Sequence, residues 1–198
     1  MRRKDTQKVA LTGILIALIA IMTFIPFIGY INIGFVTLTT IFVPVIIGII
    51  YLKDIRYSLV LGLAFGFLSF LKALVKPETL LDPFFVNPLV SIVPRILMAV
   101  VGHYVYVAFS RQSNKWLTYS VTALLTTVAN TVFVLGSLLL FYFNDINTIA
   151  VENEFASSAW SYILLIITTG SIFEFISSVV LTIIVMRATD YFIERYEH

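Results

Sequence analysis

The segment Ile41-Phe42-Val43-Pro44-Val45-Ile46-Ile47-Gly48-Ile49-Ile50 contains no charged or hydrogen-bonding side chain. A membrane-spanning β-strand would alternate apolar and polar residues over about ten positions, and this segment does not alternate. A second segment, Leu138–Phe143, is apolar in the same continuous way. The pattern therefore favours helices over the strands of a barrel, and the fold class that we expect is all-α.

The composition of the whole chain agrees with that expectation. Of its 198 residues, 60% are hydrophobic and 12% are charged, whereas soluble domains carry about 25% charged residues. Six continuous apolar runs predict six membrane spans at about 20 residues for each crossing. The spans are expected at residues 8–27, 36–52, 57–75, 88–109, 116–143 and 160–187. We expect one domain, residues 1–198, with no room for a built-in ATPase.

The charged residues predict how the chain lies in the membrane. Lys and Arg near span ends stay on the cytoplasmic side, and six spans would place most of them on one side. These basic residues are Arg2, Arg3, Lys4, Lys8, Lys53, Arg56, Arg111, Lys115, Arg187 and Arg195. We therefore expect both termini in the cytoplasm and the longest loops, 76–87 and 144–159, outside. The expected location is the plasma membrane of a bacterium.

Missing motifs exclude several functions. The net charge of +2 and the scattered basic residues do not support a nucleic-acid surface. No cysteine occurs, and no nucleotide loop, zinc helix or nucleophile elbow is present. We expect no metal, no cofactor and no catalysis. An intramembrane hydrolase that uses His103 stays an alternative, although a hydrogen-bonded structural histidine is favoured because nothing marks a nucleophile.

Arg95 is the most informative residue inside a span. It lies about seven residues into the fourth span, where an Arg side chain costs about 2.5–3.5 kcal/mol to insert, so we expect it to face a protein interior or a cavity. Pro94 lacks a backbone donor and frees the carbonyl of Val90, which predicts an irregular helix there. The guanidinium suits a carboxylate or phosphate ligand. The alternative is an internal ion pair with Glu174, and a ligand could also displace that pair.

Two asparagines accompany this arginine. Asn87 precedes Pro88 at the start of the fourth span, where helix capping alone would explain it. Asn130 lies midway along the fifth span, where capping gives no reason for it. Each amide offers a donor and an acceptor to a ligand, and the alternative for both is a hydrogen bond between helices.

Small residues recur at helical spacing in two spans. Ala10, Gly13, Ala17 and Ala20 follow one another at intervals of three and four in the first span. Gly62, Gly66, Ser69 and Ala73 do the same in the third span. Such stripes let helix backbones approach closely. We favour packing within the bundle for the third span, whereas docking of a partner protein and internal packing remain open for the first.

These features together resemble the substrate-binding S components of energy-coupling-factor (ECF) vitamin transporters. The likeness rests on six helices, cytoplasmic termini, the small-residue first helix and two runs of sequence. The runs are Val36-Thr37-Leu38-Thr39-Thr40-Ile41-Phe42-Val43-Pro44, which is expected to open the second helix, and Asp82-Pro83-Phe84-Phe85-Val86-Asn87-Pro88-Leu89-Val90-Ser91-Ile92-Val93-Pro94-Arg95. The likeness covers essentially the whole chain, and the second run looks most like the pantothenate-specific members.

The resemblance implies a function and partners. An S component binds a water-soluble vitamin from outside beneath its outer loops. It then docks on a scaffold membrane protein with two ATPases and reorients to release the vitamin. The resemblance places ligand contacts at Arg95, Asn87 and Asn130, and Glu174 joins them as the candidate partner of Arg95. It places the docking motif at Ala10, Gly13 and Ala17, with Gly13 in place of an expected alanine and Ala20 extending the stripe.

Pantothenate is the expected substrate through this resemblance, because an anion with hydroxyl and amide groups suits one cation and two amides. Riboflavin, a pyrimidine or folate are the alternative vitamins. A non-transporting membrane scaffold with the same layout is the alternative outside transport.

Overall fold

The computed structural model describes residues 3–25, 29–33, 36–154 and 156–196, and most of them are helical. In chain order the elements are α1 (Arg3–Phe24), β1 (Tyr30–Ile33), β2 (Val36–Thr39), α3 (Val43–Leu52), α4 (Ile55–Val75), the 3₁₀ helix η1 (Asp82–Val86), α5 (Pro88–Ser91), α6 (Val93–Phe109), α7 (Lys115–Glu152), α8 (Ala159–Ile166), the π-helix η2 (Ile167–Ser171) and α9 (Ile172–Tyr196). The expected all-α class is confirmed, with one small β-hairpin inside it.

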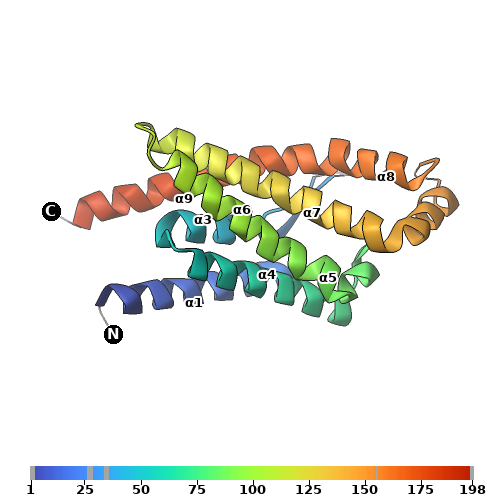
Figure 1. Ribbon diagram of the computed structural model, residues 1–198, viewed down its shortest axis with the longest axis horizontal. Coiled ribbons are helices and arrows are strands. Elements are labelled where there is room, and N and C mark those ends of the chain that lie inside the picture. Colours follow the sequence, from blue (N-terminus) through green and yellow to red (C-terminus); the bar gives the residue numbers. More distant parts are fainter. Residues whose placement is uncertain (1–2, 26–28, 34–35, 155, 197–198) are drawn as a thin grey trace.

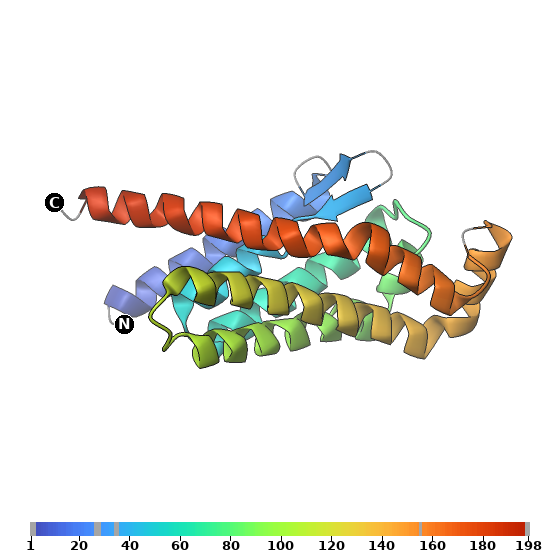
Figure 2. The ribbon, with the colours of Figure 1, turned by 90° about the horizontal axis from the view of Figure 1, so that it is seen from above.

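The long helices form an elongated bundle (Figure 1). Both ends of the chain lie at one end of this bundle, which we call the terminal end. The connection between α7 and α8 lies at the opposite end, together with η1 and α5 (Figures 1 and 2). Because of the cavity described below, we call this opposite end the cavity end.

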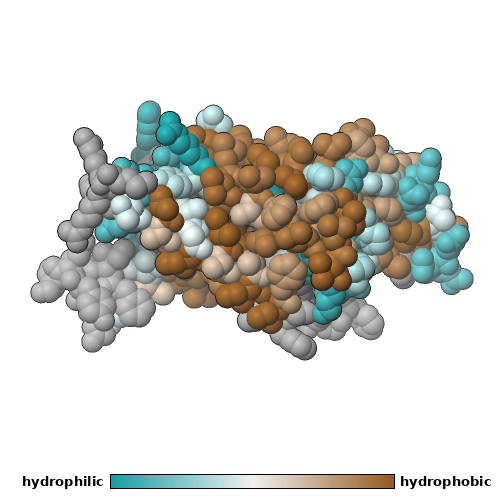
Figure 3. Space-filling view, turned by 90° about the horizontal axis from the view of Figure 1, so that it is seen from below, coloured by the Kyte–Doolittle hydropathy of each residue, from teal (hydrophilic) through white to brown (hydrophobic). Residues whose placement is uncertain are grey.

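Five helical segments of the described chain are long and apolar enough to cross a membrane. They are Asp5–Phe24, Ile55–Val75, Pro88–Phe109, Lys115–Glu152 and Ala159–Tyr191. Figure 3 shows that hydrophobic side chains cover the middle of one face, whereas hydrophilic side chains gather toward the ends. The chain is therefore a multi-pass membrane protein.

The second predicted span, 36–52, is wrong in its first part. Residues 36–39 form β2, which pairs antiparallel with β1 so that Tyr30 lies opposite Thr39. Helix α3 begins only at Val43 and has 10 residues, which is about 15 Å of helix against a hydrocarbon core of about 30 Å. Nearly all of α3 is buried inside the bundle. Its continuous apolar sequence therefore reflects burial in protein and not contact with lipid.

The predicted outer loop 144–159 is also wrong over most of its length. Helix α7 continues to Glu152, with a kink at Tyr142, whose backbone angles are not helical. This kink lies where the fifth span, 116–143, was expected to end. A connection of six residues, 153–158, leads to α8, and the side chain of Ser158 accepts a hydrogen bond from the backbone of Ser161. The last span begins where it was expected, but its helical region extends to Tyr196.

The two stripes of small residues lie in opposite environments. On α4, an added Cβ at Gly62 would come within 2.7 Å of the Arg95 carbonyl, and one at Gly66 within 2.7 Å of the Ile92 Cα. The predicted internal packing of this stripe is confirmed, since α4 lies directly against α5 and α6. On α1 the stripe points outward, and an added Cβ at Gly13 would meet nothing within 4 Å.

Candidate functional site

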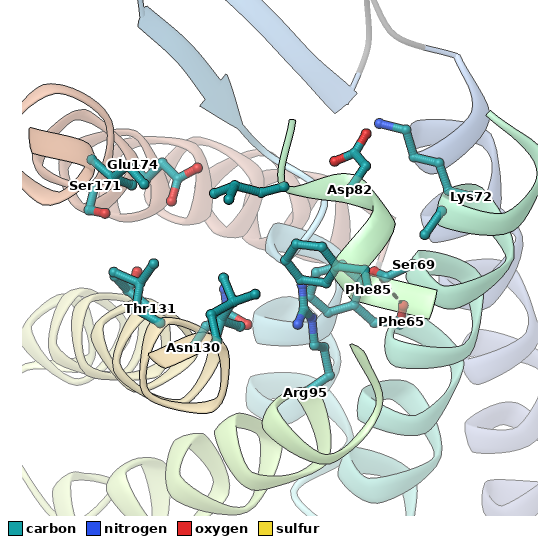
Figure 4. Close-up of a pocket in the computed structure, with 16 residues that line it drawn as sticks. Phe65, Ser69, Lys72, Asp82, Phe85, Arg95, Asn130, Thr131, Ser171 and Glu174 are labelled. Atoms are coloured by element: carbon teal, nitrogen blue, oxygen red, sulfur yellow. Dashed lines mark hydrogen bonds between the residues drawn. The ribbon is translucent and has the colours of Figure 1, made fainter. Parts of the chain in front are cut away.

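A cavity of about 240 Å³ lies between α4, η1, α6, α7, η2 and α9. Apolar and aromatic side chains form much of its wall, and eight polar or charged residues also line it. These eight are Ser69, Lys72, Asp82, Arg95, Asn130, Thr131, Ser171 and Glu174. Figure 4 shows that they come from several helices and surround one space. The cavity therefore brings together Arg95, Asn130 and Glu174, which lie far apart in the sequence.

Arg95 is anchored by a break in its helix. The chain leaves α5 at Ser91 and enters α6 at Val93, and Nη1 of Arg95 donates a hydrogen bond of 2.8 Å to the carbonyl of Val90. This is the carbonyl that Pro94 was predicted to free. The guanidinium carbon lies 4.9 Å from the ring centre of Phe85 and 5.5 Å from that of Phe65. The charged group is thus held at a fixed place, and its residue is only 7% exposed.

Glu174 and Asn130 approach the same space from other helices. Figure 4 shows the Glu174 carboxylate across the cavity from the Arg95 guanidinium, with a space between them. Asn130 projects from α7 toward the cavity, and its Oδ1 is buried without a hydrogen-bond partner in the described part of the chain. A buried amide oxygen without a donor costs about 1–3 kcal/mol. A ligand with an N–H or O–H group would remove this cost.

Asn87 is placed differently. Its Oδ1 accepts a hydrogen bond from the backbone of Leu89 at 3.0 Å, which caps α5, and its Nδ2 donates to the hydroxyl of Tyr142 at 3.3 Å. It is not among the residues that line the cavity. The capping alternative therefore describes this residue, and we leave Asn87 out of the proposed binding site.

The segment between α4 and α5 covers part of the cavity. Asp82 holds it in shape, because its carboxylate accepts hydrogen bonds from the backbone of Glu78 and of Thr79. Lys72 is buried at the end of α4 and forms an ion pair of 3.0 Å with Glu78. Hydrogen bonds from Lys76 and Lys72 lower the pKa of the Glu78 carboxyl. The ion pair between Lys72 and Glu78 thus holds the segment between α4 and α5 against α4.

Sequence reasoning missed Lys72, Asp82 and Phe85 as residues of this site. Lys72 did carry a signal, because a lysine in an otherwise apolar run, 57–75, itself indicates function. Phe85 carried no such signal, because the chain contains 17 Phe. Only the fold shows which of these rings lies against the guanidinium.

His103 lies away from the cavity. It follows Arg95 by eight residues on α6, which is about 12 Å toward the terminal end, and it is not among the cavity residues. Its Nδ1 is buried and makes no hydrogen bond within the described residues, and its ring and that of Tyr104 pack in a T-shaped arrangement, 5.7 Å between centres. No serine in the described chain is seen to bond to it, so nothing in its surroundings resembles an activated nucleophile.

Comparison with known proteins extends this description. Residues 7–186 match the family model described as ECF transporter, substrate-specific component. The chain belongs to this family. The family consists of transporter components and is not an enzyme family, and membership agrees with the apolar helices of a multi-pass protein in the bacterial cell membrane.

A curated relative agrees with the family match. This S component is 29% identical to the pantothenic acid transporter PanT of Lactococcus lactis subsp. cremoris (strain MG1363). The alignment covers 95% of this chain and 96% of the relative, so the likeness extends over nearly all of both sequences.

Proposed function

We propose that this S component binds pantothenate in the cavity and delivers it into the cell with an ECF module of one scaffold membrane protein and two ATPases. The observation that carries the proposal is the buried Arg95 guanidinium on the wall of a small, mostly apolar cavity. A cation in such surroundings recognises an anion through charge-assisted hydrogen bonds. The name of the relative PanT supports the choice of vitamin.

The remaining polar groups suit the rest of pantothenate. Its carboxylate would meet Arg95. The amide and the two hydroxyl groups offer N–H and O–H donors, which suit the Asn130 Oδ1 and the Glu174 carboxylate. The apolar wall, which includes Val134, Leu135 and Leu138, suits the methyl groups.

The volume of the cavity favours a small vitamin. Pockets for drug-sized ligands measure about 300–1,000 Å³, and this cavity of about 240 Å³ lies below that range. Riboflavin and folate carry fused rings and need more room than the acyclic pantothenate. A non-transporting scaffold would not need a cavity lined by a buried cation and by an amide oxygen that has no hydrogen-bond partner among the described residues, so that alternative has less support.

The proposed orientation follows from charge. The connections from α3 to α4 and from α6 to α7 lie at the terminal end (Figure 1); they contain Lys53 and Arg111, and Lys115 begins α7. The segment between α4 and α5 contains Glu78 and Asp82, with Lys76 as its basic residue. Because basic residues remain in the cytoplasm, we propose that both termini are cytoplasmic and that the cavity faces outward. The outward-facing stripe on α1 is the proposed docking surface for the scaffold protein.

The experiment compares pantothenate with pantothenol, which carries a hydroxyl in place of the carboxylate, on the wild-type protein and on Arg95→Ala. Removing one partner of a buried charged pair costs about 2–5 kcal/mol, or roughly 30-fold to several-thousand-fold in affinity. We expect Arg95→Ala to lose pantothenate by this amount. Pantothenol should bind the wild type weakly and lose little more in the variant.

Two controls accompany this cycle. Arg56→Ala removes an exposed arginine near the terminal end and should leave pantothenate binding unchanged. Arg95→Lys keeps the charge without the planar fork and should recover part of the affinity. Additive losses from Arg95→Ala and from pantothenol would show that the guanidinium does not meet the carboxylate. If the wild type binds neither ligand but binds another vitamin in a thermal-shift panel, the substrate assignment is wrong.

A further inference from the structure

The chain between α8 and α9 forms a π-helix where it passes the cavity. In η2 the backbone N–H of Ile172 donates to the carbonyl of Ile167, which is five residues back instead of four. Turns of this kind are rare and occur frequently at functional sites. Cavity residues lie on both sides of the turn, with Ile166 before it and Ser171 and Glu174 at its end and beyond.

The π turn changes which residues face the bundle. Ile163 and Ser171 are both buried, with exposed fractions of 5% and 4%, although they are eight residues apart. An α-helix rotates about 100° for each residue, so eight residues of α-helix would carry Ser171 about 80° away from the face of Ile163. A π turn takes more residues for each turn than an α-helix, so it offsets this angle of about 80° and brings Ser171 back to the face of Ile163. Ser178 and Thr182 then follow Ser171 at helical spacing and are fully buried.

Two threonines bind the carbonyl groups at this turn. The hydroxyl of Thr168 donates to the carbonyls of Leu164 and Leu165, at 2.9 and 3.1 Å. The hydroxyl of Thr169 donates to the carbonyl of Leu165 at 2.6 Å. The Leu164 carbonyl also accepts the backbone N–H of Ile167, whereas the Leu165 carbonyl, directly before η2, accepts both hydroxyls. Inside a membrane, Thr side chains are among the groups that supply donors to the backbone where a helix is irregular. Both threonines are exposed and neither lines the cavity.

We propose that Thr168 and Thr169 are positioning residues that stabilise the π turn, and that this turn sets the register in which Ser171 and Glu174 face the cavity. This inference rests on the proposed function, since it assigns the cavity wall of α9 a role in binding pantothenate. It adds to that function a role for two residues outside the cavity, whose hydroxyl groups stabilise a helix turn that contains one extra residue.

The test uses deletion of Gly170. Removing one residue lets η2 become a regular α-helix while Ser171 keeps its direction, because seven residues rotate about 700°, close to two full turns. If the threonines act through the π turn, loss of their hydroxyls should change the register of Ser171 and the binding of pantothenate in the chain that retains Gly170. It should change neither after the deletion. The variants are Thr168→Val with Thr169→Val, deletion of Gly170, and the combination of both.

Two readouts follow the register and the binding separately. The chain contains no cysteine, so Ser171→Cys introduces a single thiol whose reaction with a water-soluble thiol reagent reports access from the cavity. In the chain that retains Gly170, we expect the paired valines to lower the labelling rate of Ser171→Cys by roughly tenfold. We expect them to lower pantothenate affinity, measured in a protein without the cysteine, by a similar factor, because two hydrogen bonds are lost. After deletion of Gly170 we expect the valines to change neither.

Thr189→Val is the matched control, since the Thr189 hydroxyl donates to the Val185 carbonyl at 2.9 Å within regular α9. It should change neither readout, and Thr168→Ser with Thr169→Ser should behave like the wild type because the hydroxyls remain. Valine effects of equal size with and without Gly170 would overturn the inference. A paired-valine protein that folds only when Gly170 is deleted would support it, whereas failure to fold in both backgrounds would overturn it. If labelling follows the expected pattern but the protein binds no pantothenate, the role of the threonines in setting the register is supported and the proposed substrate is contradicted.

Discussion

The stripes on α1 and α4 share one sequence pattern and have opposite surroundings. Each consists of four small residues at intervals of three and four. The α4 stripe lies so close to α5 and α6 that two of its glycines leave no room for a methyl group. The α1 stripe faces away from the bundle, with Ala10, Gly13 and Ala17 exposed.

The two stripes therefore suit two kinds of close helix packing, one within the bundle and one with a partner outside it. On α4, contact with backbone atoms of Arg95 and Ile92 helps to place the break between α5 and α6, and with it the guanidinium of the cavity. On α1, the same spacing leaves a smooth surface at which another helix could approach. Spacing therefore predicts that a stripe allows close packing, but it does not say against what.

The largest effect is expected where the closed stripe is filled. Gly66→Leu would push a side chain into the backbone of Ile92, and overpacking costs about 1–3 kcal/mol even where side chains can move aside. Because backbone must move here, we expect little folded protein, measured by gel filtration and thermal unfolding in detergent. Gly136→Leu on α7 is the control, since an added Cβ there meets nothing within 4 Å. A normally folded Gly66→Leu protein would contradict the close packing of α4.

The next effect concerns assembly. Ala17→Leu should block approach of a partner helix without disturbing the bundle, because Ala17 is exposed. We expect weak association with the ECF module, measured by co-purification, together with normal thermal unfolding and pantothenate binding. Leu18→Ile, at an exposed position about 100° around the helix from Ala17, should assemble normally. Joint loss of folding and binding in Ala17→Leu would mean that the stripe packs internally.

A smaller substitution tests whether α4 positions Arg95 in the cavity. In Gly62→Ala the new methyl group would come within 2.7 Å of the Arg95 carbonyl and 2.8 Å of the Ala99 Cβ. Moving α6 to relieve this contact should cost about 1–3 kcal/mol of unfolding free energy and weaken pantothenate binding, measured by thermal shift and calorimetry. Unchanged stability and affinity would show that α4 does not position Arg95.

The smallest effect is expected at the open stripe. Gly13→Ala should raise stability by about 0.5–1 kcal/mol, because alanine favours the helix over glycine and space for its Cβ is open. Assembly should persist, since alanine is also small. The measurement is the thermal unfolding midpoint together with co-purification, and a lower midpoint would indicate a contact on α1 that the open surface does not suggest.

Several features of the site follow from local sequence. Pro94 cannot donate a backbone hydrogen bond, which predicted the free carbonyl of Val90, and the structure shows the Arg95 guanidinium bonded to it. The cost of a buried charge predicted that Arg95 faces protein. Helix capping explained Asn87 from the sequence but gave no reason for Asn130, and of the two only Asn130 lines the cavity.

The sequence by itself determined the membrane class, the positions of most spans and the buried arginine, because hydrophobicity and charge act through each residue's own transfer free energy. Tertiary structure decided the rest. A continuous apolar run is the same whether lipid or protein surrounds it, so only packing shows that α3 is short and enclosed and that α7 continues past its span. The facing of each small-residue stripe and the register after the π turn depend likewise on which helices become neighbours, and that is a property of the whole bundle.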